Sequence, residues 1–238
     1  LPSHQPCTTP PMIRAIPSPR PATDMFHRIV LSALLAGAIA GLWIFVGHIT
    51  LTTPLILQAE ASETAAAVTT DWMPVDGLER TAYTLLSDMV IAMGFAFLLV
   101  GAMSLSGRPV DWRRGLVWGG CGFIVFSVSP AIGLPPELPG MMSAELQARQ
   151  IWWVGAAVAA IVGLYLIFLT ERRVLGLLGL VVIILPHVIG APQHEAYVND
   201  IPVDLIREFI LNTMLVSGSF WLILGGVAGH FYNKLERN

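Results

Sequence analysis

The chain has few charged residues and very little cysteine. Only 12% of its 238 residues are charged, about half the share that is usual in a soluble protein. The two cysteines, Cys7 and Cys121, lie far apart in the sequence, so they form neither a disulfide framework nor a CxxC metal motif. The formal net charge of −3 gives no indication of a nucleic-acid partner.

The sequence also lacks the common catalytic motifs. No HExxH, P-loop or GxSxG string occurs, so it supports neither a metalloprotease, an ATPase nor a serine hydrolase. An intramembrane enzyme would need a recognisable nucleophile and base, and no such pair stands out. We therefore expect a protein that is not an enzyme and has no resident cofactor.

Apolar residues are abundant, and their grouping indicates the fold class. They make up 55% of the chain and fall in blocks of about twenty residues, the length that crosses a bilayer. We predict an all-α, polytopic membrane bundle of six helices. The predicted spans are about 28–49, 81–105, 115–133, 151–170, 174–190 and 209–232. Small residues at four-residue spacing, as in Gly225 and Gly229, are interpreted as helix-packing faces.

The charged residues predict how these spans are oriented. With six spans, ten of the thirteen basic residues fall on the side of the two termini, and eleven of the sixteen acids fall in the opposite loops. Loops rich in Lys and Arg stay in the cytoplasm, so we predict that both termini are cytoplasmic. Five spans would place the two termini on opposite sides and lose this asymmetry.

The first residues differ in composition from the rest of the chain. Residues 1–24 are rich in proline and have no apolar period, which predicts a disordered tail before a single transmembrane domain at 25–238. Because "MFHRIVLSALLAG" from Met25 resembles a bacterial start, one interpretation places the tail outside the native protein. A signal peptide is the alternative, since Arg28 precedes an apolar stretch. The length of Ile29 to Ile49 favours a retained span.

One acidic residue lies inside a predicted span. Asp88 stands eight residues after Arg80, roughly 12 Å along the helix axis from the outer end of the second span. Such a residue usually faces the bundle interior and marks an ion or proton path. The alternative is an aspartate satisfied by neighbouring hydroxyls such as Thr84 and Ser87.

A histidine marks the end of the fifth span. His187 follows Pro186, which has no N–H and leaves the carbonyl of Val182 without its helical partner. Free backbone groups at membrane depth are tolerated only inside protein or beside a water-filled cavity. The segment therefore indicates either a site or a simple helix end with an interfacial histidine.

Further carboxylates and imidazoles fall on the same predicted outer side. Glu60 lies in "PLILQAE", an apolar segment too short to span, which we predict to be re-entrant or interfacial. Carboxylates and imidazoles together suit divalent transition metals, and these donors accept nickel as well as cobalt. The predicted metal ligands are His187, Glu137, Asp88, Glu60, His48 and His194.

Several strings resemble those of a known family, in the same order. They are "MFHRIVLSALLAGAIAGL", "PLILQAE", "GLPPELPG" followed by "ARQIWW", "LPHVIGAP" and "FWLILGGVAGHFY". From Met25 to about Leu235 the chain is similar to the CbtA family of predicted cobalt transporter subunits. The resemblance implies cobalt uptake across a bacterial inner membrane, a link to cobalamin-dependent regulation and a small single-span, histidine-rich partner called CbtB. It offers Glu60, Glu137 and His187 as ligands, whereas His48 and His194 rest on topology alone.

Two functions of different classes follow from these observations. The first is the membrane subunit of a cobalt uptake transporter, driven by a partner or by the membrane potential because the chain has no nucleotide-binding motif. A divalent cation moving inward gains roughly 4.6 kcal/mol per 100 mV. The second is a non-transporting membrane scaffold or assembly subunit whose polar residues only satisfy buried groups.

Overall fold

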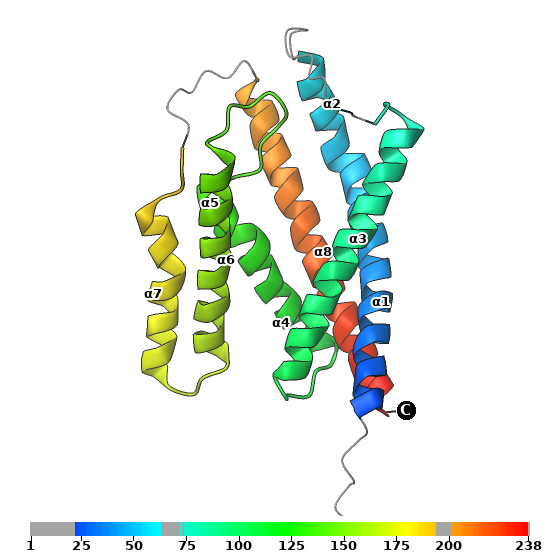
Figure 1. Cartoon of the computed structure of the whole chain (residues 1–238), viewed down its shortest axis with the longest axis vertical. Coiled ribbons are helices and arrows are strands. Elements are labelled where there is room, and N and C mark those ends of the chain that lie inside the picture. Colours follow the sequence, from blue (N-terminus) through cyan, green and yellow to red (C-terminus); the bar gives the residue numbers. More distant parts are fainter. Residues whose placement is uncertain (1–21, 63–71, 73, 194–200, 238) are drawn as a thin grey trace, which may run out of the picture.

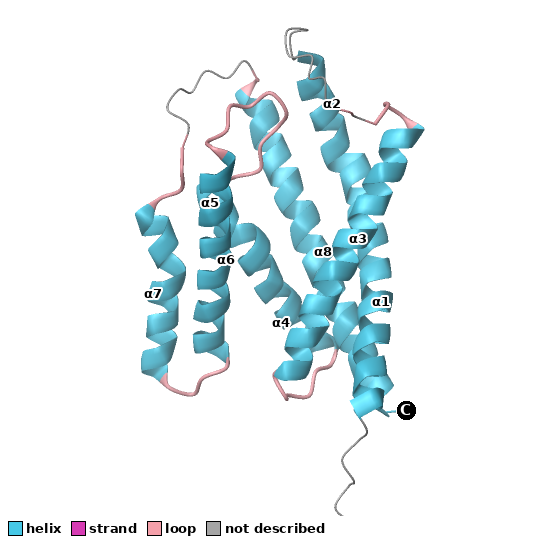
Figure 2. Ribbon diagram, viewed as in Figure 1, coloured by secondary structure: helices cyan, strands magenta, loops and turns pink. Residues whose placement is uncertain are grey.

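The computed structural model describes residues 22–62, 72, 74–193 and 201–237. Every secondary-structure element within these ranges is helical, as Figure 2 shows, so the predicted all-α class is confirmed. Most of the predicted tail lies outside the described residues. Its last three residues, Ala22 to Asp24, begin the first helix instead, so the predicted boundary was three residues late.

Eight α-helices and two π-helical turns are present among the described residues. In chain order they are α1 (Ala22–Gly47), η1 (His48–Thr52), α2 (Thr53–Ser62), α3 (Leu78–Leu105), α4 (Trp112–Phe123), η2 (Ile124–Val128), α5 (Ser129–Gly133), α6 (Leu146–Phe168), α7 (Arg173–Ile189) and α8 (Val203–Arg237).

Five helical stretches in the described part are long and apolar enough to cross a membrane, which fits a membrane bundle. They correspond to the first, second, third, fourth and sixth predicted spans. The fifth predicted span corresponds to α7, a shorter apolar helix of 17 residues. At about 25 Å, α7 lies at the lower limit of a spanning helix, so six spans remain a prediction.

The re-entrant alternative for the segment "PLILQAE" is wrong, because α1, η1 and α2 form one continuous helical stretch from Thr23 to Ala61. The interfacial alternative stays a prediction. Pro54 lies at the start of α2 and has no N–H to donate. The turn before it widens, and Thr53 N–H bonds to the carbonyl of His48, five residues earlier. The helix therefore passes the proline without breaking.

The third stretch passes a proline in the same way. Here η2 precedes Pro130, and the N–H of Ser129 bonds to the carbonyl of Ile124, again five residues earlier. In both places a π-helical turn moves the carbonyl that the proline ring would otherwise crowd. Turns of this kind often occur at functional sites, and here one contains His48 and the other Ser127.

The helices pack in pairs through small residues. The most extensive contacts join α1 to α3, α4 to α8, α6 to α7 and α1 to α8. A Cβ on Gly225 or Gly229 of α8 would overlap the backbone of α4, which confirms that these two glycines form a packing face. Figure 1 shows α6 and α7 side by side, apart from α1 and α3.

The start of α1 and the end of α8 lie at the same end of the bundle (Figure 1). Arg28 fixes them together: its Nε donates to the carbonyl of Tyr232 at 2.9 Å, and its Nη2 lies 3.0 Å from Glu236. We call this the inner end and the opposite one the outer end. Two helix ends on one side are compatible with an even number of spans, and the count of six stays a prediction.

Candidate functional site

The histidine of the first π-helical turn contacts the aspartate of α3. His48 Nδ1 lies 2.9 Å from Oδ1 and 3.0 Å from Oδ2 of Asp88. The Asp88 side chain is 6% exposed, and a carboxylate that is so buried needs a polar partner. The imidazole of His48 is therefore the partner of this carboxylate. Thr84, which the sequence suggested as an alternative partner, donates instead to the carbonyl of Arg80.

The hydrogen bond also determines which ring nitrogen of His48 is available. Because Nδ1 faces the carboxylate, Nε2 is the nitrogen left to bind another group, and no hydrogen bond to it occurs within the described ranges. A carboxylate that orients an imidazole in this way is the usual arrangement behind a metal-binding histidine. The geometry makes His48 the candidate ligand and Asp88 the group that orients it.

Glu60 is held by an arginine at the outer end. Arg80 Nη1 donates to Glu60 Oε2 at 2.9 Å and to Asp76 Oδ1 at 2.8 Å. A second hydrogen bond joins Arg80 Nη2 to the other Glu60 oxygen, so the contact between the two residues is bidentate. This pair ties α2 to α3. A metal ion could use Glu60 only by displacing the guanidinium.

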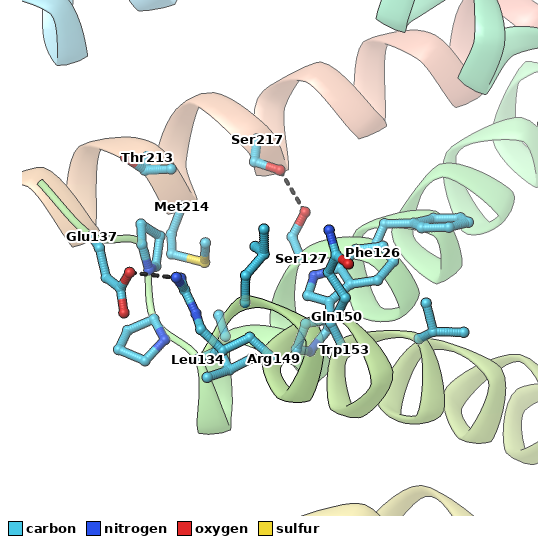
Figure 3. A pocket seen from close by; sticks show the side chains of 16 residues that line it. Phe126, Ser127, Leu134, Glu137, Arg149, Gln150, Trp153, Thr213, Met214 and Ser217 are labelled. Atoms are coloured by element: carbon cyan, nitrogen blue, oxygen red, sulfur yellow. Dashed lines mark hydrogen bonds and ion pairs between the residues drawn. The ribbon is translucent and has the colours of Figure 1, made fainter. Parts of the chain in front are cut away.

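Glu137 also pairs with an arginine, and it lines a cavity of about 490 Å³. Its Oε2 accepts hydrogen bonds from Arg149 Nη2 at 2.6 Å and from Ser143 Oγ at 2.6 Å. Figure 3 shows the ion pair beside Met214 and Thr213 of α8. The loop between α5 and α6 is thereby fixed to the first turns of α6.

His187 belongs to α7 and contacts α5 and α6. Its Nε2 is 3.4 Å from Ser129 Oγ, and its ring lies against Trp152 with 5.8 Å between the ring centroids. Trp152 Nε1 donates to the carbonyl of Pro186 at 3.3 Å. His187 Nδ1 is buried and has no hydrogen-bond partner in the described part of the chain. His187 is therefore half-buried in the last turn of α7, where it packs against α5 and α6, and its role as a ligand stays a prediction.

The predicted ligands that the structure describes do not form one cluster. Among the residues that the structure describes, no three His, Cys, Asp or Glu side chains lie close enough to hold one metal ion. Only His48 and Asp88 contact each other, and His194 lies outside the described residues. The ligand set as a whole remains a prediction.

Sequence reasoning missed the partners of these residues. Arg80 and Arg149 are two of only three basic residues on the predicted outer side, and each pairs with a predicted ligand. Because basic residues are rare on the predicted outer side and acids are common there, the two ion pairs could have been expected from the sequence. Nothing in the sequence pointed to Ser129 beside His187.

The comparison with known families decides the family of the chain. A family model described as "Probable cobalt transporter subunit (CbtA)" matches residues 26–233, most of the chain. The chain belongs to the CbtA family. No match was found among curated proteins or among solved structures.

Family membership agrees with the membrane bundle and assigns it a broad role. A CbtA protein is described as a subunit of a transporter, which implies at least one further component. The description concerns transport rather than catalysis. Together with the apolar helices, it supports a multi-pass membrane protein.

Proposed function

We propose that this CbtA-family protein is the membrane-spanning subunit of a cobalt uptake transporter in a bacterial inner membrane, serving cobalamin metabolism. The observation that carries the proposal is the family match over residues 26–233. We further propose six spans, with α7 as the fifth, and cytoplasmic termini. The contact of Arg28 with the end of α8 supports placing both termini on one side.

The proposed path of the metal ion starts at the outer end. His48 offers Nε2 to the ion while Asp88 holds Nδ1 and supplies negative charge at 2.9 Å from the ring. His187, with its unpartnered Nδ1, is a second candidate position. Glu60 and Glu137 stay predictions, since each carboxylate is already paired with an arginine.

A partner subunit would supply the additional metal ligands that a complete site needs. A divalent ion that leaves water needs several donors at once, because a bare charge in lipid is prohibitively costly. In the described part of this chain, no three acidic, cysteine or histidine side chains lie close enough together to hold one metal ion. We propose that a small, single-span, histidine-rich partner of the CbtB type completes the ligand set, and that the membrane potential drives uptake.

The test is uptake of labelled cobalt into liposomes that hold the purified protein, alone and together with the CbtB-type partner. We expect accumulation that requires an inside-negative potential. Nickel serves as the second cargo in the same assay. If the protein is a scaffold, neither metal accumulates in either preparation.

Single substitutions test whether the metal ion passes the proposed residues. His48→Ala, His187→Ala and Asp88→Asn should each abolish most cobalt accumulation in cells while protein abundance stays near normal. His230→Ala is the matched control, because His230 is an exposed histidine near the inner end of α8. A scaffold role would lower abundance and uptake together. Normal uptake by all three variants at normal abundance would show that the path is wrong.

A further inference from the structure

The first and third helical stretches have the same construction around their prolines. In each, a five-residue π-helical turn is followed by one residue and then a proline, which is Pro54 after η1 and Pro130 after η2. A glutamate follows six or seven residues later and pairs with an arginine near the start of the next long helix, which gives the pairs Glu60–Arg80 and Glu137–Arg149. The hairpin from α1 to α3 and the hairpin from α4 to α6 therefore share one motif.

The correspondence extends to the contact beside each π-helical turn. In the first hairpin this contact is the His48–Asp88 pair. The residue of α6 that matches Asp88, counted from the arginine of each ion pair, is Ala157, and it packs in one buried cluster with Val125 of η2. In both hairpins the second long helix thus meets the first stretch at its π-helical turn.

The two hairpins differ on the inner side of this contact. There α1 and α3 pack closely, and a Cβ on Gly37 would lie 2.8 Å from the backbone of Met93. In the second hairpin α6 meets the third stretch chiefly at η2 and α5, whereas α4 packs on α8. Figure 1 shows α4 and α6 diverging toward the inner end. The same motif is therefore present in two arrangements, one packed and one splayed.

The splayed hairpin is tied at its inner end by an exposed hydrogen bond. Arg108 Nη1, in the loop after α3, donates to the carbonyl of Phe168 at the end of α6, at 3.2 Å. Within the described ranges α7 packs on α6 far more extensively than on any other helix. A movement of α6 would therefore carry α7 with it and would have to break the contact of Arg108.

The outer half of α6 borders the cavity of about 490 Å³. Figure 3 shows Gln150 and Trp153 of α6 on one side of it and Met214 and Ser217 of α8 on the other. Because a helix is stiff, α6 can act as a lever about its contact with η2. A swing that brings its inner half toward α4 carries its outer half away from α8.

We propose that α6 and α7 rock as one unit about η2, between the splayed arrangement of this structure and a packed one like that of α1 and α3. Rocking toward α4 closes the inner end and widens the outer cavity, and the reverse movement narrows the cavity. A π-helical turn within a long helix is a common hinge, and transporters built from repeats open their two sides in turn by such rocking. The movement is a property of this chain and requires no cobalt.

The test is double electron–electron resonance on the full chain in liposomes without cobalt, with Cys7→Ser and Cys121→Ala as the background. Spin labels are attached to cysteines that replace exposed side chains: Val117 and Tyr165 for the inner halves of α4 and α6, Leu146 and Leu211 for the cavity, and Leu35 and Leu98 for a control pair on α1 and α3. We expect two distances for the inner pair and for the cavity pair, and one for the control pair. As the inner distance shortens, the cavity distance should lengthen.

Substitutions test the hinge and the inner contact. Arg108→Gln removes the hydrogen bond to Phe168, so the share of the splayed distance should fall by about twofold or more. Arg113→Gln is its matched control, because the Arg113 guanidinium lies over the Trp112 ring, and it should leave the shares unchanged. Pro130→Ala restores a backbone N–H at the hinge and should leave the inner pair with one distance, whereas Pro54→Ala should leave both.

Three results would overturn the proposal. One is an inner pair that shows a single distance, as narrow as that of the control pair, in both the parent protein and Arg108→Gln. Another is an inner and a cavity distance that shorten together, which would mean compaction rather than rocking. The third is two inner distances in unchanged shares after Pro130→Ala, which would exclude η2 as the hinge. All three measurements are independent of whether the protein transports cobalt.

Discussion

His48 Nδ1 lies within 3.0 Å of both carboxylate oxygens of Asp88, although forty residues separate the two in sequence. The contact joins the π-helical turn that follows α1 to a residue within α3, away from both ends of that helix. It places a carboxylate and an imidazole at one depth in the bundle. The Asp88 side chain is 6% exposed and depends on the imidazole for a polar partner, whereas the His48 side chain is 30% exposed.

Replacing Asp88 should therefore destabilise the fold, to a degree that depends on the substitute. Asp88→Ala leaves the imidazole without its acceptor and should lower the free energy of unfolding by about 1–3 kcal/mol. Asp88→Asn keeps an oxygen acceptor and should lower it less. Thermal unfolding in detergent measures both. Asp76→Ala, at a side chain that is 74% exposed, is the control and should change stability little.

The crossing of α4 and α8 predicts a sharp difference between two adjacent glycines. A Cβ on Gly119 would overlap the carbonyl oxygen of Trp221, whereas a Cβ on Gly120 would meet nothing within 4 Å. Gly119→Ala should force the helices apart and cost about 1–3 kcal/mol of unfolding free energy. Gly120→Ala should be neutral or slightly stabilising. Equal melting temperatures for the two variants would contradict this packing.

Reporter fusions can check the orientation of the bundle. A reporter fused after Asn238 and another inserted within residues 171–173 should both report the cytoplasm. A third, placed in the loop between α5 and α6, should report the opposite side. A periplasmic C-terminus would mean that α7 does not span, or that the predicted orientation is inverted.

Removing the tail should leave the protein intact. A chain that starts at Met25 loses only the first three residues of α1 and keeps Arg28, which bonds to the end of α8. We expect membrane insertion, yield and melting temperature to match those of the full chain. Loss of insertion on truncation would show that residues 1–24 take part in targeting.

The spans could be predicted because lipid imposes their length. Twenty apolar residues are needed to cross the hydrocarbon core, so the runs of the sequence and the helices coincide closely. The prediction of a re-entrant segment fails at Pro54, where the helix continues past the proline. A proline that follows a π-helical turn does not end a helix, and hydropathy carries no information about such a turn.

The side-chain partners could not be predicted for a different reason. Helices that are apolar on most faces do not reveal which face meets which neighbour. The contacts of His187 with Ser129 and of Glu137 with Arg149 depend on the rotation and height of each helix. These are determined by packing, such as the close approach of glycines on α4 and α8, and the order of residues alone does not specify that packing.

The length of the first helical stretch has a consequence for how the molecule meets its surroundings. From Thr23 to Ala61 it has 39 residues, about 58 Å, nearly twice the thickness of the hydrocarbon core. If Arg28 lies at one lipid surface and the helix crosses upright, the last two or three turns of α2 extend beyond the hydrocarbon core on the other side. Glu60 and Arg80 would then be among the first groups that a solute in the external fluid encounters, well before it reaches the membrane plane.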